Sequence, residues 1–178
     1  MNRDQALVQA CLQQDRKAQR QLYELYGGKL FAIILRYLKH REEAEDILQE
    51  VWIRIFTNLG SFRFDCPLEA WLKRIAINTS IRALQKQPQW KGMLDTDGLE
   101  IGLEDSMSAL DQLTLAELHH LIRQLPDGCR TIFNLYAIEG YKHHEIAELL
   151  GITEGTSKSQ YFRAKAMLQK EVKEIQII

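Results

Sequence analysis

The chain has few cysteines and no cysteine pattern. Its 178 residues include three, Cys11, Cys66 and Cys129, which are odd in number and lack CxxC spacing. A disulfide framework or a zinc knuckle is therefore not expected. A reducing cytoplasm fits this cysteine usage best.

Long hydrophobic runs are also missing. The longest apolar run, residues 30–35, is far too short to cross a bilayer, and the N-terminus lacks the apolar core of a signal peptide. We therefore expect no membrane span, no export and a cytoplasmic location.

Charge of one sign does not dominate the chain. The formal net charge is -1, so the chain lacks the basic excess that would by itself indicate nucleic-acid binding. Acidic residues are concentrated in one stretch: residues 87–108 carry one Lys or Arg against five Asp or Glu, whereas residues 1–86 carry 14 against 10. The acidic stretch also mixes Pro, Gly and Ser without periodicity, which is typical of a linker.

Patterns typical of an enzyme or a metal centre do not stand out. There is no Gly-rich phosphate loop, no nucleophile elbow and no pair of catalytic acids. The pairs His119–His120 and His143–His144 are adjacent, and adjacent helical residues point about a hundred degrees apart, so they make poor joint ligands. We therefore expect no enzyme activity, no metal and no cofactor.

Helical periodicity runs along most of the chain, and no strand pattern appears. Apolar residues recur at three- and four-residue spacing, with interruptions expected at Gly27–Gly28 and at His40–Arg41. A helix is expected over residues 42–59. Another is expected to start at Pro67, because proline suits a first helical turn.

The helical period stops at the acidic stretch and returns after it. The sequence therefore predicts an all-α protein with two small helical domains, at residues 1–86 and 109–178, joined by a linker at 87–108.

The last third of the chain carries the pattern of a helix-turn-helix. Residues 144–159, HEIAELLGITEGTSKS, read as two helices joined by a turn, in which Gly151 supplies the left-handed backbone. Thr153 or Thr156 can cap the second helix. A basic helix behind a tight turn suits a DNA major groove, although such pairs also pack as plain hairpins.

Three motifs occur in a fixed order along the chain. They are residues 43–52 (EAEDILQEVW), 71–78 (WLKRIAIN) and 155–165 (GTSKSQYFRAK). Together they resemble the extracytoplasmic-function sigma factors, a two-domain group of bacterial transcription initiation factors. The resemblance covers nearly the whole chain and implies that core RNA polymerase and promoter DNA are its partners.

The first motif forms a polar ridge opposite the apolar stripe of its helix. A solvated helix face would explain this ridge equally well. The resemblance implies instead that the ridge docks on the clamp helices of RNA polymerase. The candidate docking residues are Glu43, Asp46, Gln49 and Glu50.

The second motif and the loop before it combine aromatic, amide and cationic side chains. Buried loop anchors are one explanation for the aromatic residues. The resemblance implies instead a pocket that stacks and hydrogen-bonds an extruded nontemplate-strand base of the -10 element. The candidate residues for this strand capture are Phe62, Phe64, Lys73, Arg74, Asn78 and Arg82.

The third motif begins the recognition helix, where side chains reach base edges and phosphates. Gln160 stands where the resembled factors commonly carry Arg, and Ser157 stands where an aliphatic residue is common. The candidates for reading the -35 element are Thr156, Lys158, Ser159, Gln160 and Arg163. The helix also runs through the apolar residues Tyr161, Phe162, Ala164 and Leu168, with its basic residues on other faces.

Two other functions stay open on the residues alone. One is a helix-turn-helix transcriptional regulator that acts without core polymerase. The other is a helical enzyme with an accessory C-terminal module, which the missing catalytic residues disfavour. For the sigma-factor reading, the acidic linker would thread polymerase channels meant for nucleic acid. Amphipathic faces on both domains also leave room for an anti-sigma factor.

Overall fold

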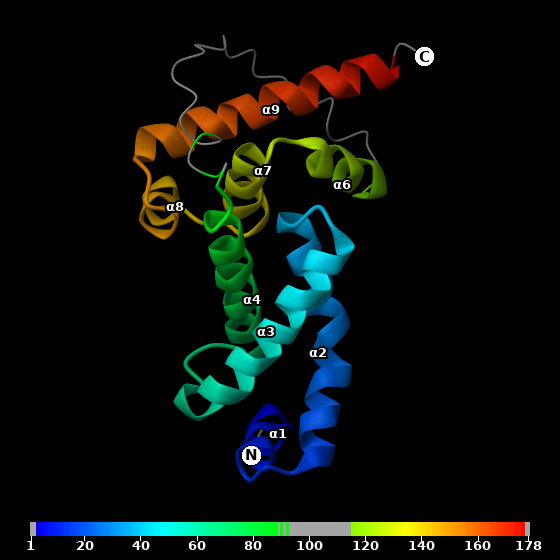
Figure 1. Cartoon of the computed structure of the whole chain (residues 1–178), viewed down its shortest axis with the longest axis vertical. Helices are drawn as coiled ribbons and strands as arrows, with labels where there is room; N and C mark the ends of the chain where they lie inside the picture. The colour runs from blue at the N-terminus through cyan, green and yellow to red at the C-terminus, as the bar shows by residue number, and fades with distance from the viewer. Residues whose placement is uncertain (1–2, 89, 91, 93–114, 177–178) are drawn as a thin grey trace. The chain divides into compact units, whose positions relative to one another are not determined.

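The computed structural model describes residues 3–88, 90, 92 and 115–176 of the chain. Within these residues every regular element is a helix, which confirms the all-α prediction (Figure 1). The chain divides into two compact units, Met1–Leu84 and Gln85–Ile178. Most of the expected linker, residues 93–108, lies outside the described residues, so the linker stays a prediction.

Unit 1 consists of long helices joined by short turns. They are α1 (Arg3–Leu12), α2 (Arg16–Tyr37), α3 (Arg41–Asn58), the 3-10 turn η1 (Leu59–Ser61) and α4 (Leu68–Gln85). Helix α3 begins and ends one residue before the expected bounds, and α4 begins one residue after the expected start. Pro67 accepts the first backbone hydrogen bonds of α4 from Ala70 and Trp71, and so stands at its N-terminus as expected.

The predicted interruption at Gly27–Gly28 is wrong, because α2 continues through both glycines. Each glycine inside a helix costs about 1 kcal/mol relative to alanine. Burial of the apolar stripe on both sides of the pair outweighs this cost. The stripe consists of Leu22, Leu30, Ile33 and Ile34, each at most 9% exposed.

The interruption at His40–Arg41 is confirmed. Tyr37 ends α2, Leu38 is extended, and His40 is the N-cap residue of α3. The turn brings α3 back against α2. Their shared core holds Leu22, Leu30, Ile34, Ala44, Val51 and Ile55, all at most 2% exposed.

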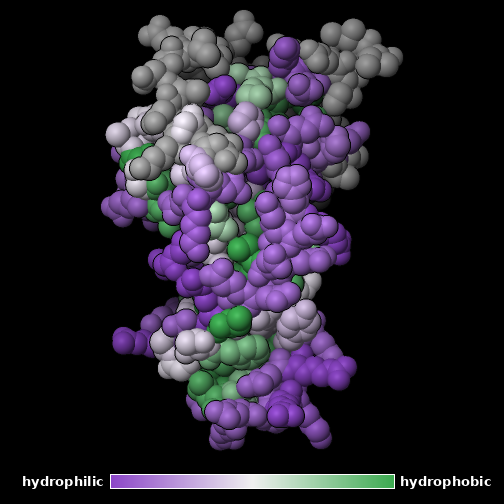
Figure 2. Space-filling model, viewed as in Figure 1, coloured by the Kyte–Doolittle hydropathy of each residue, from purple (hydrophilic) through white to green (hydrophobic). Residues whose placement is uncertain are grey.

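One face of unit 1 carries little apolar surface (Figure 2). Figure 2 shows a mainly hydrophilic face, with an apolar area over α1 and the C-terminal end of α3. Leu12, the last residue of α1, is 43% exposed in this region.

Unit 2 is also helical. It contains α6 (Leu115–Gln124), α7 (Asp127–Phe133), the π-helical turn η3 (Asn134–Ile138), α8 (His143–Leu150) and α9 (Glu154–Gln176). The C-terminal helix α9 packs on α6, α7 and α8. The buried core joins Leu121, Ile122, Leu125, Cys129, Phe133, Ala164, Leu168 and Val172.

A buried arginine closes the turn between α6 and α7. Arg130 is 1% exposed, and its guanidinium lies 2.8 Å from Asp127 and donates to the carbonyl oxygen of Leu125 at 3.1 Å. Burial lowers the pKa of Arg130, and the neighbouring Asp127 carboxylate acts in the opposite direction. The pair orients α7, on which α9 packs.

The helix-turn-helix forms as expected between α8 and α9. Gly151 has φ 68° and ψ 38°, the left-handed conformation that ends α8. Of the two candidate caps, Thr153 performs the role, because its Oγ1 accepts a hydrogen bond from the Thr156 backbone at 3.0 Å. This hydrogen bond satisfies one of the backbone amides in the first turn of α9 that have no partner within the helix.

Candidate polymerase and nucleic-acid interfaces

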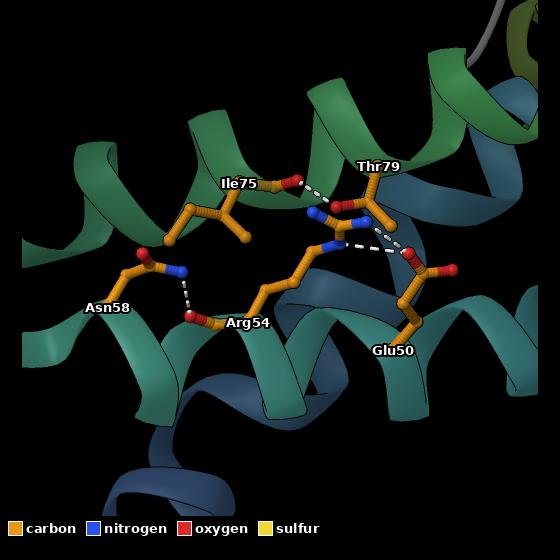
Figure 3. A network of polar contacts seen from close by, with 5 residues as sticks. All are labelled: Glu50, Arg54, Asn58, Ile75 and Thr79. Atoms are coloured by element: carbon orange, nitrogen blue, oxygen red, sulfur yellow. Dashed lines mark hydrogen bonds and ion pairs between the residues drawn. The ribbon is translucent and has the colours of Figure 1, made fainter.

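The polar ridge on α3 is exposed at three of its four expected positions. Glu43, Asp46 and Gln49 are exposed to solvent. Glu50 departs from the expectation, because its carboxylate is half-buried and bound to Arg54, with Oε1 2.9 Å from Nε and 2.6 Å from Nη2. Figure 3 shows this pair on the side of α3 that faces α4.

An exposed apolar residue continues the ridge. Ile53 is 67% exposed and follows Gln49 by four residues, so the two share one face of α3. Ile53 was not among the predicted docking residues, although its seven- and four-residue spacing from Asp46 and Gln49 indicates the same helix face. An apolar residue at the end of a polar ridge is the composition expected of a docking surface.

A groove of about 420 Å³ lies between α2 and α3. Gly27 and Gly28 line one side and leave space there because they carry no side chain, while Phe31 and Leu48 provide apolar walls. Glu45, one residue before Asp46, also lines the groove. The groove and the outer ridge therefore meet along α3.

The loop before α4 holds two aromatic rings in different environments. Phe62 is 7% exposed and packs against Phe64 and Trp71, with ring centroids 4.6 and 5.2 Å away. Phe62 is thus a buried anchor and cannot stack on a base while the loop keeps this conformation. Phe64 is half-exposed and has φ 60°, a left-handed conformation that is uncommon for a bulky residue. Such conformations cluster at functional sites.

Asn78 lies on the face of α4 that continues from these rings. Trp71, Ile75, Asn78 and Arg82 follow one another at four-, three- and four-residue spacing, which places them on one side of the helix. Asn78 is half-exposed, and none of the described residues forms a hydrogen bond with its side chain. Its amide is therefore available to a ligand.

Cationic residues border this face. Arg74 and Arg82 are exposed, and Lys73 is half-buried. The expected strand-capture residues therefore share α4 and the loop before it. Phe62 is buried against Phe64 and supports that ring, but it offers no surface on which a base could stack.

The first turns of α9 expose some of the expected -35 residues. Lys158 and Ser159 are exposed, and Thr156 and Arg163 are partly exposed. Lys158 forms an ion pair with Glu154 at 2.6 Å, and the two side chains are about half exposed. An exposed pair of this kind is weak and can exchange for a phosphate.

The expectation that Gln160 reaches a base edge is wrong for this structure. Gln160 is 1% exposed, and its Oε1 accepts a hydrogen bond from the Cys129 thiol at 2.9 Å. It precedes the buried Ala164 by four residues and therefore points into the domain. A polar side chain occupies the core here because a buried donor 31 residues away satisfies it.

Phe162 takes the outward position that Gln160 does not have. It was grouped with the apolar residues of the helix, yet its side chain is 37% exposed. It follows Lys158 and Ser159 by four and three residues, so it shares their face. Aromatic side chains on such a face contact the methyl group of thymine in the major groove.

A histidine links α8 to the first turn of α9. His143 Nδ1 lies 2.9 Å from the hydroxyl of Ser157, which is fully buried, and the imidazole stacks on Tyr136 at 4.3 Å between centroids. Burial lowers the pKa of His143, with the Lys158 charge acting in the same direction and Glu154 in the opposite one. Folding therefore disfavours protonation of this imidazole.

This arrangement predicts a pH dependence of stability. Because the folded state lowers the pKa of His143, the unfolded state binds more protons as the pH falls below the ordinary histidine value of about 6.5. The free energy of unfolding should then decrease from pH 7 to pH 5.5. His143→Gln should reduce this slope, and His144→Gln, at the exposed neighbour, should not. Urea unfolding at each pH, monitored by circular dichroism, measures this dependence of the free energy of unfolding on pH. Equal slopes for both variants would contradict the role of His143.

Neither a candidate metal site nor a candidate membrane span occurs among the described residues. In that part of the chain no group of three or more His, Cys, Asp or Glu side chains is placed to hold a metal ion. No described helix is long and apolar enough to cross a membrane.

Comparison with known proteins identifies the family. Residues 22–89 match the sigma-70 region 2 family, and residues 115–168 match the sigma-70 region 4 family. The ECF RNA polymerase sigma-E factor of Haemophilus influenzae is 31% identical over 180 residues, which cover 95% of each protein. The chain therefore belongs to the extracytoplasmic-function (ECF) RNA polymerase sigma factors.

Solved structures share this fold. CnrH, in complex with the cytosolic domain of CnrY, aligns with a TM-score of 0.53 at 21% identity over 97% of this chain and 99% of that one. The sigma factor RpoE of Bartonella quintana, in complex with the anti-sigma factor NepR, aligns with a TM-score of 0.52 at 24% identity over 86% of this chain and 96% of RpoE.

The family defines the general role of the chain. It binds core RNA polymerase and directs transcription initiation at promoters. Sigma factors are regulators of polymerase and not themselves catalysts.

Proposed function

We propose that each of the three surfaces described above has a separate role in transcription initiation. The ridge of Asp46, Gln49 and Ile53 on α3 docks on core polymerase. The face of α4 around Asn78 captures a flipped base of the melted -10 element. The first turns of α9 read the -35 element in the major groove.

One observation carries the proposal most directly. The Asn78 amide is unpaired among the described residues and lies on a helix face with the half-exposed ring of Trp71 and the exposed cation of Arg82. An amide recognises a base edge, a cation holds a phosphate, and an aromatic ring supports a stacked base. A solvated helix face has no need for this combination.

The docking surface has the polar and apolar parts of a protein interface. Asp46 and Gln49 supply polar contacts, and Ile53 supplies an apolar anchor. The adjoining groove between α2 and α3 adds concave surface of about 420 Å³. An elongated partner, such as a pair of helices, would fill both features together.

In the groove-reading part of the proposal, Phe162 replaces Gln160. Phe162→Ala should relax the preference for one thymine of the -35 element by about 1 to 3 kcal/mol, the usual cost of one mismatched base pair. Gln160→Ala should lower stability and leave base preference unchanged, because Gln160 is buried. Binding of the holoenzyme to a -35 library provides the measurement. A changed base preference in Gln160→Ala with none in Phe162→Ala would reverse this assignment.

The proposal is tested by promoter binding with and without polymerase. We expect the chain with core polymerase to protect both the -10 and -35 regions, and the chain alone to give little specific protection. Footprinting of the chain, core polymerase and the mixture on one promoter fragment makes the comparison. Equal protection by the chain alone would favour a regulator that acts without polymerase.

The cellular location of the chain follows from the same proposal. We expect it to act in the cytoplasm, because RNA polymerase and the chromosome lie there. An anti-sigma factor would be a further partner, since RpoE of Bartonella quintana was solved with one.

A further inference from the structure

Arg54 has no place in the proposed function, yet it lies between two of the proposed surfaces. It projects from α3 toward α4, where Figure 3 shows its guanidinium beside Ile75 and Thr79. Ile75 shares its helix face with Asn78, and Thr79 follows Asn78 directly. The guanidinium therefore borders the strand-capture face from the side of the docking helix.

The Arg54 charge is engaged by Glu50. Nε and Nη2 both donate to the same carboxylate oxygen, at 2.9 and 2.6 Å, and the two side chains are 37% and 39% exposed. An ion pair with this exposure contributes little free energy and exchanges readily for another partner. On α4, Figure 3 shows Ile75 and Thr79 opposite this pair, and the Thr79 hydroxyl donates to the Ile75 carbonyl at 2.7 Å.

Two neighbours on α3 contact Arg54, Asn58 at its backbone and Glu50 at its side chain. Asn58 Nδ2 donates to the backbone carbonyl of Arg54 at 2.7 Å, and Glu50 holds the tip of the side chain one turn earlier. The ion pair with Glu50 holds the guanidinium on the side of α3 that faces α4 (Figure 3) and neutralises its charge. Glu50 directly follows Gln49, a residue of the docking ridge.

We propose that Arg54 is a further strand-binding residue, and that Glu50 neutralises it until polymerase contacts Glu50. The ligand is a phosphate of the nontemplate strand next to the base at Asn78. Docking at Glu50 and phosphate binding at Arg54 then favour each other, because each removes a partner from the same ion pair. This inference rests on the proposed function, which supplies both partners.

The test compares single-strand binding by the full chain, free and in holoenzyme formed with saturating core polymerase. The ligand is an oligodeoxynucleotide with the nontemplate -10 sequence, titrated at several salt concentrations. The variants are Glu50→Gln, Arg54→Ala, Arg54→Lys and the double variant Glu50→Gln/Arg54→Ala. Glu69→Gln is the matched control, because it breaks the exposed Lys29–Glu69 ion pair at 2.9 Å, whose residues belong to none of the proposed surfaces.

In the free chain, Glu50→Gln should strengthen binding roughly two- to five-fold, the factor that corresponds to one exposed ion pair. It should also steepen the logarithmic salt slope by about 0.7, the value for one additional phosphate contact to a single strand. The double variant should lose both gains, and Glu69→Gln should show neither.

In holoenzyme, Arg54→Ala should make the logarithmic salt slope shallower by about 0.7, and Arg54→Lys should keep the parental slope. Glu50→Gln should bind as the parent does, because polymerase has already freed Arg54. An unchanged slope for Arg54→Ala in holoenzyme overturns the proposal, as do equal gains for Glu50→Gln and Glu69→Gln in the free chain. Asn78→Ala distinguishes a failure of this inference from a failure of the proposed function. If it weakens binding while the Arg54 variants do not, only the present inference fails. If it binds as the parent does, the strand-capture function itself fails.

Discussion

Replacing Asp46 and Gln49 together by alanine should nearly abolish binding to core polymerase. Both side chains are exposed, so their truncation should change the free energy of unfolding by less than about 0.5 kcal/mol each. At the centre of an interface, truncation of an anchoring residue costs about 2 kcal/mol or more, so two such losses lower affinity by roughly a thousand-fold.

The comparison requires a variant with equal loss of polar surface elsewhere. Lys17→Ala/Gln21→Ala removes two exposed side chains that lie four residues apart on α2, and it should bind polymerase as the parent does. Titration of labelled chain with core polymerase gives both affinities. Parental affinity in the Asp46/Gln49 variant would remove the ridge from the docking surface.

Asn78→Ala should strongly reduce promoter opening on duplex DNA, and Phe64→Ala should do the same through loss of stacking. Loss of one base stack costs about 1 to 3 kcal/mol, so open complexes should fall by roughly five- to a hundred-fold. The mutated Asn78 is half-exposed and leaves no buried partner unsatisfied among the described residues. Permanganate reactivity of melted thymines measures the open complex.

A premelted template gives the control for this experiment. It removes the cost of unpairing, so it should restore part of the loss in both variants while the missing base contact remains. Phe62→Ala should behave differently, because Phe62 is 7% exposed and anchors the loop. That variant should unfold at a lower temperature, as losing a buried aromatic costs about 3 to 5 kcal/mol. Parental permanganate reactivity in both Asn78→Ala and Phe64→Ala would exclude the capture surface.

The elements could be predicted where local signals agree. The expected helix at 42–59 is observed as Arg41–Asn58, because its apolar spacing and flanking break point to the same element. Gly151 marks the helix-turn-helix for a similar reason, since the turn requires a left-handed residue. Gly27–Gly28 misled the prediction because tertiary burial of α2 outweighs local propensity.

The interfaces were predicted less completely, because they depend on partners distant in sequence. Gln160 is polar and was expected in the groove, but Cys129 on α7 satisfies it inside the core. Phe162 was grouped only with the apolar residues of the helix and not with the DNA-reading candidates, but the core face of α9 is filled by Ala164 and Leu168, and Phe162 is exposed. Glu50 differs, because its four-residue spacing from Arg54 was visible in the sequence, although the direction of the pair toward α4 was not.

Run-off transcription with purified core polymerase tests the central claim most directly. On a genomic promoter fragment, core polymerase with the chain should start at one discrete position, and core polymerase alone should not. The Asp46/Gln49 and Asn78 variants should lose this product, and the Lys17/Gln21 variant should retain it. A start site that appears without the chain, or that persists in both the docking and capture variants, would contradict the account.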